Sequence, residues 1–72
     1  MEVSVETLAR LLQTLSEPNR LRIIRVLTTK CQSVTAIVEA TGLSQPLVSH
    51  HLRVLRQEGL VRGARRGSFI DY

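Results

Sequence analysis

The stretch TGLSQPLVSHHLRVLRQEGLV, residues 41–61, decides the fold that we predict for this chain. Gly42 stands where an apolar helical pattern ends, and glycine readily adopts the left-handed conformation that closes a helix. Only Leu43 separates it from Ser44, whose hydroxyl can cap the N-terminus of a second helix. Two helices joined by so short a turn form a helix-turn-helix.

Outside this stretch, apolar side chains recur at three- and four-residue steps in two further segments, which is the spacing of amphipathic helices. After Gly59 come two short apolar runs, 60–62 and 68–72, around the turn GARRG, a pattern typical of a hairpin. The sequence therefore predicts a mostly α fold with a small β-hairpin. It is a winged helix-turn-helix with four helices and a two-stranded wing, in a single domain spanning 1–72. The four expected helices lie at about 5–15, 17–28, 34–41 and 45–58, and the expected hairpin spans about 60–72.

The expected helix starts and core follow from the same patterns. Ser16 and Ser33 are the expected N-caps of the second and third helices. The inward faces of the helices and the first strand predict a core of Leu8, Leu21, Ile24, Leu27, Ile37, Val48, Leu52, Leu55 and Val61.

Length and composition narrow the class of protein. A domain of 72 residues with 43% hydrophobic content is globular but small, and such domains usually gain stability by association, disulfides or a metal. Cys31 is the single cysteine, so an internal disulfide is ruled out. There is no apolar run of about 18 residues, so we expect no membrane span. The first residues carry acids where a secretory signal needs lysine or arginine, so we expect no targeting segment and a cytoplasmic location.

The charge is unevenly distributed along the chain. The net charge is +4. After Leu43 the chain has only two acids, Glu58 and Asp71, but five arginines, namely Arg53, Arg56, Arg62, Arg65 and Arg66. A basic C-terminal half is what a polyanion-binding surface needs, although a solvated arginine-rich face has the same composition.

The helix expected at 45–58 has two contrasting faces. Val48, Leu52 and Leu55 follow one another at steps of four and three, so they share one face and point to the core. The opposite face is nearly free of acids and offers hydrogen-bonding groups, which base edges in the major groove of DNA require. This face collects Pro46, Leu47, His50, Arg53, Val54 and Gln57, with Gln45 and Ser49 at its margins. We therefore interpret the helix as a recognition helix for double-stranded DNA.

Two stretches carry a resemblance to a known family. LSEPNRLRIIRVL, residues 15–27, and TGLSQPLVSHHLRVLRQEGLVRGARRGSFIDY, residues 41–72, resemble the arsenic-repressor (ArsR/SmtB) family of winged-helix regulators. The resemblance covers nearly the whole chain. It implies a homodimeric transcriptional repressor that leaves its operator when a metal ion or another chemical signal binds.

The predicted site follows from the helix faces and this resemblance together. We expect the recognition helix 45–58 in the major groove of an inverted-repeat operator, and the wing 62–68 on the flanking backbone. The expected DNA contacts are Ser44, Gln45, Pro46, Ser49, His50, Arg53, Arg65 and Arg66. The expected dimerisation residues are Leu8, Leu11, Leu12 and Leu15.

The sequence predicts no metal site and no cofactor within these residues. Family members that sense soft metals often carry a Cys-x-Cys at the start of the third helix, and those positions here are Ser33 and Thr35. His50 and His51 are adjacent, so on a helix their side chains point about 100° apart and cannot chelate one ion together. Cys31 has no partner at ligand spacing and is interpreted as a small, partly buried filler. A small effector or metal acting outside this segment is left open.

An enzyme and a protein- or RNA-binding module are the two other classes of function to compare with a DNA-binding domain. An enzyme is excluded, because no phosphate-binding glycine loop and no nucleophile–base pair stand at a recognisable spacing. The alternative is a winged-helix module that binds protein or RNA without recognising an operator. Such a module should expose a contiguous apolar patch on the 45–58 helix, whereas here His50, Arg53 and Gln57 lie among Leu47 and Val54.

Overall fold

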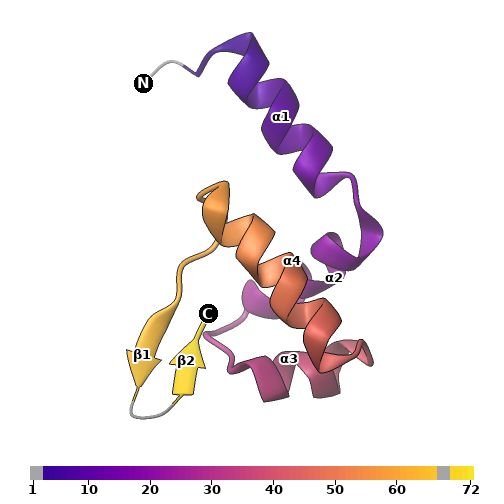
Figure 1. The fold of residues 1–72 in the computed structure, drawn as a ribbon, viewed down its shortest axis with the longest axis vertical. Coiled ribbons are helices and arrows are strands. Elements are labelled where there is room, and N and C mark those ends of the chain that lie inside the picture. The colour runs from indigo at the N-terminus through magenta and orange to yellow at the C-terminus, as the bar shows by residue number, and fades with distance from the viewer. Residues whose placement is uncertain (1–2, 67–68) are drawn as a thin grey trace.

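In a computed structural model, the chain folds as four helices followed by a two-stranded antiparallel sheet (Figure 1). The structure describes residues 3–66 and 69–72, and the side chains of residues 65, 66 and 69 lie outside this description. Every predicted helix is confirmed to within one residue at each end. The elements are α1 (Val5–Leu15), α2 (Pro18–Leu27), α3 (Val34–Thr41), α4 (Gln45–Gln57), β1 (Ala64–Arg66) and β2 (Phe69–Asp71).

The helices begin where side-chain oxygens accept hydrogen bonds from free backbone N–H groups. Ser33 and Ser44 cap α3 and α4 in this way, as predicted. The predicted cap Ser16 is wrong, because Pro18 occupies the first helical position and the residue before it becomes the cap. Glu17 accepts a hydrogen bond from the N–H of Arg20, and Ser16 instead ends α1.

Gly42 ends α3 with a φ of 75°, in the left-handed conformation that the sequence predicts. Its N–H donates to the carbonyl oxygen of Val38 at 2.9 Å. A non-glycine residue would be strained in this conformation. The turn between α3 and α4 therefore depends on this glycine.

The core lies where α2 and α3 meet one face of α4. Its fully buried side chains are Ile23, Ile37, Val48, Leu52 and Leu55, and Ile24, Leu27 and Val61 are partly buried against them. Two predicted core residues are wrong: Leu8 is 50% exposed and Leu21 is 49% exposed. On α2 it is Ile23 that faces α4, so Leu21, two residues earlier, points away from the core.

Helix α1 projects away from the other elements (Figure 1). Its C-terminal end is anchored through the buried Thr14 and through Leu15, which packs against the core. Val5 is 78% exposed and Leu12 59% exposed, because nothing within the described chain covers that side of the helix. This arrangement also explains why Leu8 lies outside the core.

The wing differs from the predicted hairpin. Leu60 and Val61 form no strand; they lie between α4 and the wing and pack on the core, which is why this run is apolar. Strand β1 starts at Ala64, so Arg65 and Arg66 pair with Ile70 and Phe69 rather than forming the turn. Residue 67 of the predicted turn and residue 68 of the predicted second strand lie outside the described residues.

The wing is joined to the segment that precedes α3. Gln32 and Tyr72 exchange two backbone hydrogen bonds of 2.8 and 2.9 Å, and Ser33 forms a bridge with Asp71. The C-terminal strand is therefore held between its hairpin partner and the start of the helix-turn-helix.

The burial pattern predicts opposite outcomes for one substitution at two leucines. Leu52→Ala should lower the free energy of unfolding by about 2–5 kcal/mol, because it leaves a cavity in the core. Leu21→Ala, made on the exposed side of α2, should cost about 1 kcal/mol or less. Urea unfolding followed by circular dichroism measures both. Equal losses at the two positions would contradict this core.

Candidate nucleic-acid interface

Packing determines which face of α4 is available to a ligand. Val48, Leu52 and Leu55 are buried, so the side of the helix away from them faces solvent. Gln45, Pro46, His50 and Arg53 are exposed there, and Ser49 is half-exposed. The structure thus brings together on one helix the residues that the sequence predicts for this face.

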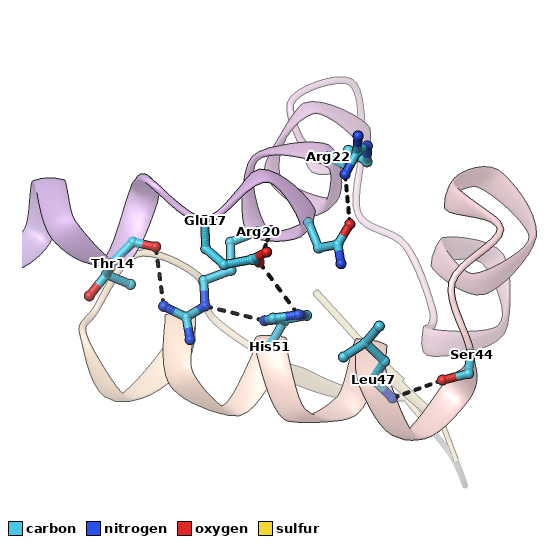
Figure 2. Close-up of polar contacts among 8 residues, drawn as sticks. Thr14, Glu17, Arg20, Arg22, Ser44, Leu47 and His51 are labelled. Atoms are coloured by element: carbon cyan, nitrogen blue, oxygen red, sulfur yellow. Dashed lines mark hydrogen bonds and ion pairs between the residues drawn. The ribbon is translucent and has the colours of Figure 1, made fainter.

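The N-terminal end of α4 is suited to an anion. Ser44 accepts a hydrogen bond from the N–H of Leu47 at 3.3 Å, which fixes the first turn (Figure 2). The partial positive charge of a helix N-terminus favours a phosphate. No aspartate or glutamate occurs from Ser44 to Gln57, so no acidic side chain of this helix opposes an anion.

The predicted wing contacts are placed only in part. Arg65 and Arg66 are paired in β1, which follows α4 and its short connection (Figure 1). The prediction that they contact DNA concerns side chains outside the described part of the chain.

The four predicted dimerisation leucines do not share one environment. Leu8 and Leu12 are exposed, Leu11 is half-buried, and Leu15 packs against the core of its own chain. Val5 extends the exposed stripe by one turn. The uncovered apolar surface of α1 is therefore centred on Val5, Leu8 and Leu12.

A polar cluster that the sequence did not predict lies on the inner side of α4. His51 is only 5% exposed, and its Nδ1 accepts a hydrogen bond from Nε of Arg20 at 3.2 Å (Figure 2). Nη1 of Arg20 donates to the carbonyl oxygen of Thr14, also at 3.2 Å. Nε2 of His51 lies 3.5 Å from Oε2 of Glu17. One signal was available in the sequence: His51 is three residues after Val48 and four before Leu55, which places it on the core face.

Burial and neighbouring charges shift the titration of this cluster. Burial lowers the pKa of His51, as do the charges of Arg20 and His50, whereas Glu17 acts in the opposite direction. Loss of hydration alone would raise the pKa of Glu17, but the N–H groups of Asn19 and Arg20 and the nearby charges of His51 and Arg20 lower it overall. At neutral pH the cluster therefore holds an ionised Glu17 and a neutral His51.

No metal-binding group can be assembled from the described residues, among which three or more histidine, cysteine or acidic side chains nowhere gather. Cys31 is exposed rather than the partly buried filler that the sequence suggests, because it lies in the turn before α3. Within residues 3–66 and 69–72, no helix is long and apolar enough to cross a membrane.

Comparison with known proteins identifies the family. The family model described as "Bacterial regulatory protein, arsR family" matches residues 17–62, from the cap of α2 to the segment that follows α4. The chain belongs to the ArsR family. Its predicted family and its winged helix-turn-helix fold are thereby confirmed.

Two curated relatives and one solved structure show the extent of the ArsR likeness. The HTH-type transcriptional regulator NmtR of Mycobacterium tuberculosis is 48% identical over 64 residues, covering 89% of this chain and 53% of the relative. The biofilm growth-associated repressor of Xylella fastidiosa is 38% identical over 72 residues, covering 100% of this chain and 63% of the relative. A homodimeric winged helix-turn-helix DNA-binding domain from Mycobacterium bovis superposes with a TM-score of 0.87 at 32% identity, over 94% of this chain and 63% of that one.

These matches indicate the class of protein to which the relatives of this chain belong. The matched relatives are regulators of transcription, which agrees with the exclusion of an enzyme. The chain spans about half the length of the first relative and under two thirds of the second.

The buried cluster predicts how stability changes with pH. In the unfolded chain His51 is protonated near its ordinary pKa of 6.5, whereas in the folded chain its pKa is lower. The free energy of unfolding should therefore be highest above pH 6.5 and should fall as the pH drops below it. Glu17 should add a further loss below its ordinary pKa of 4.5. Urea unfolding between pH 8 and pH 4 measures the change. His51→Asn keeps an acceptor for Arg20 but does not titrate, so it should flatten the loss just below pH 6.5. An equally steep loss in this variant would refute the assignment to His51.

Proposed function

We propose that the chain binds double-stranded DNA as a homodimer and represses transcription at an inverted-repeat operator. The observation that carries this proposal is the outward face of α4, which is exposed, rich in hydrogen-bonding groups and free of acids from Ser44 to Gln57. Base edges in the major groove and the phosphates beside it call for that combination.

The residues of this face divide into two roles. Ser44, Gln45 and Pro46 surround the helix N-terminus, where they meet a phosphate or the first base. Ser49, His50 and Arg53 lie along the following turns and reach base edges. Arg65 and Arg66 contact the flanking backbone from the wing, which fixes the position of the domain without reading sequence.

A second copy of the chain covers the exposed stripe of α1. Val5, Leu8 and Leu12 lie along one side of an amphipathic helix that has no partner within the described chain, and Leu11 and Leu15 continue it toward the core. The similar domain from Mycobacterium bovis is homodimeric. A two-fold axis between paired α1 helices presents two α4 helices about 34 Å apart, which calls for an inverted repeat.

Repression is carried over from the relatives. The matched relative from Xylella fastidiosa is named as a repressor. A repressor of this type acts in the cytoplasm. The signal that releases it, a metal ion or small effector, binds outside these residues.

The alternative is a winged-helix module that binds protein or RNA. Leu47 and Val54 are half-buried on the outer side of α4, among the exposed His50 and Arg53. The outer side of α4 therefore offers no contiguous apolar patch to a protein partner. DNA is therefore the preferred ligand.

Ser44→Asp separates the stability of α4 from its affinity for DNA. Aspartate caps a helix as well as serine does, so the free energy of unfolding should stay the same. The new carboxylate faces a phosphate, so affinity for duplexes selected from a random pool should fall by at least about tenfold. Ser4→Asp, which adds the same charge at the cap of α1, should leave affinity nearly unchanged. If the wild-type dimer enriches no duplex at all, the DNA proposal fails and the protein- or RNA-binding module replaces it.

Leu12→Glu tests the dimer and the inverted repeat together. Because Leu12 is 59% exposed, the substitution should leave the core intact but place charge in the α1 pair. Sedimentation at micromolar concentration should show monomers, and affinity for a two-half-site duplex should fall about 100-fold or more, toward that of a single half-site. Gln13→Glu, one residue along and exposed, is the control and should remain dimeric. A Leu12→Glu chain that still sediments as a dimer would place the interface elsewhere.

A further inference from the structure

At the corner between α1 and α2, the projecting helix α1 is held by buried and partly buried groups. Thr14 is the one buried residue of α1, and its carbonyl oxygen accepts a hydrogen bond from Arg20. The same guanidinium donates to His51, in the middle of α4 (Figure 2). Arg20 thus connects the end of α1 to the helix that carries the predicted DNA-reading face.

We propose that His51 is a positioning residue: its neutral ring, acting through Arg20, holds α1 at a fixed angle to α4, and protonation of the ring releases that angle. This inference rests on the proposed function, in which α1 pairs two copies and α4 reads DNA. It assigns no DNA contact to His51, whose ring lies on the buried side of α4.

The hydrogen bond from Arg20 determines the state of the ring. Since Nδ1 accepts from Arg20, the neutral ring carries its proton on Nε2, which points toward Glu17. A second proton could enter only at Nδ1. That proton would turn the acceptor into a donor facing another donor, and the hydrogen bond from Arg20 would be lost.

Burial is the main factor that opposes protonation of the ring, and the charged groups around it act in both directions. From α2 and its cap, Arg20 and Glu17 face the ring with opposite charges. From α4 itself, the ring of His50 lies 5.3 Å away, centroid to centroid. From α1, the carbonyl group of Thr14 adds no charge. Because the ring is only 5% exposed, burial disfavours its charged form, and the pKa of His51 is lowered in agreement with this.

The second polar link between α1 and α4 is weaker. Nε of Arg10 lies 3.0 Å from Oε2 of Glu58, but the Arg10 side chain is 61% exposed. Exposed ion pairs of this kind contribute little and are screened by salt. The angle of α1 therefore depends mainly on the buried corner.

Small rotations at this corner have large effects at the far end of α1. The helix has 11 residues. At 1.5 Å per residue it is about 16 Å long, so a rotation of about 10° at one end moves the other by about 3 Å. In a dimer paired through α1, such a displacement changes the spacing of the two α4 helices, which must match successive major grooves.

The distance between α1 and α4 can be measured directly as a function of pH. Spin labels are attached at Gln13→Cys and Gln57→Cys, both on exposed positions, in a Cys31→Ser background, and labelled chains are diluted with unlabelled chains so that only distances within one chain are seen. The wild-type pair should give one narrow distance distribution at pH 8 and a shifted or broader one at pH 5. His51→Asn should keep the narrow distribution at both values. His50→Asn, the same change one residue earlier on the exposed face, should follow the wild type.

A second variant gives a signature that a merely structural role would not produce. Glu17→Gln removes the carboxylate that favours the protonated ring, so the change in distance should shift to lower pH. A wild-type distribution that does not change between pH 8 and pH 5 would overturn the proposal. So would a His51→Asn chain that changes like the wild type, or a loss of helical circular dichroism in step with the change in distance, since protonation would then unfold the domain.

DNA binding supplies the functional readout. Below pH 6.5 the affinity of the wild type should fall relative to that of His51→Asn, by at most about tenfold per pH unit for each proton taken up. Equal pH profiles for the two proteins would overturn the link to DNA. If the wild type binds no duplex at pH 8, the proposed function fails, while the distance measurement still decides whether His51 positions α1.

Discussion

The contact between α4 and the pair of isoleucines on α2 and α3 is the constraint on which the rest of the molecule depends. Ile23 and Ile37 are fully buried against Val48, Leu52 and Leu55. Because side chains at steps of three and four share one face of a helix, burial of these three on α4 leaves the opposite face of α4 in solvent. The core of this small domain and its predicted reading surface are therefore two faces of one helix, and neither can rotate without the other.

A polar cluster lies next to this apolar contact and has a different role. Apolar side chains tolerate small sliding movements, whereas the hydrogen bonds of Arg20 to Thr14 and His51 are directional. None of the buried polar side-chain atoms within the described chain lacks a hydrogen-bond partner. A fully satisfied buried network favours one arrangement of the helices over its near alternatives. The cluster thus specifies the angle of α1, while the apolar core supplies most of the stability.

Much of the fold could be predicted from the sequence, because its local signals are strong. Gly42 and Ser44 mark a helix end and a helix start with one residue between them, and the apolar spacing of α4 is regular. The errors arose where tertiary contacts decide. Leu8 has the spacing of a core residue but no partner in the described chain. Leu60 and Val61 are apolar because they pack on the core, and so short an apolar run looks the same in sequence as a strand.

In the candidate site, too, local patterns predicted some features and tertiary contacts decided the others. The exposed side chains of α4 could be predicted from its periodicity alone. The role of His51 could not, since its partners Arg20 and Glu17 lie more than 30 residues away in the chain. Periodicity places a side chain on a face but does not say which distant side chain meets it there.

The pairing of Gln32 with Tyr72 makes the wing part of the same unit as the helix-turn-helix. Strand β2 lies between β1 and the backbone that leads into α3, and Ser33, which caps α3, also bridges to Asp71. The loop after α2 and the C-terminal strand therefore form one module, although the whole helix-turn-helix separates them in sequence. Anyone exchanging wings between regulators of this fold would have to transplant residues 32–33 along with the hairpin, or the new wing would lose its backbone pairing with the segment before α3.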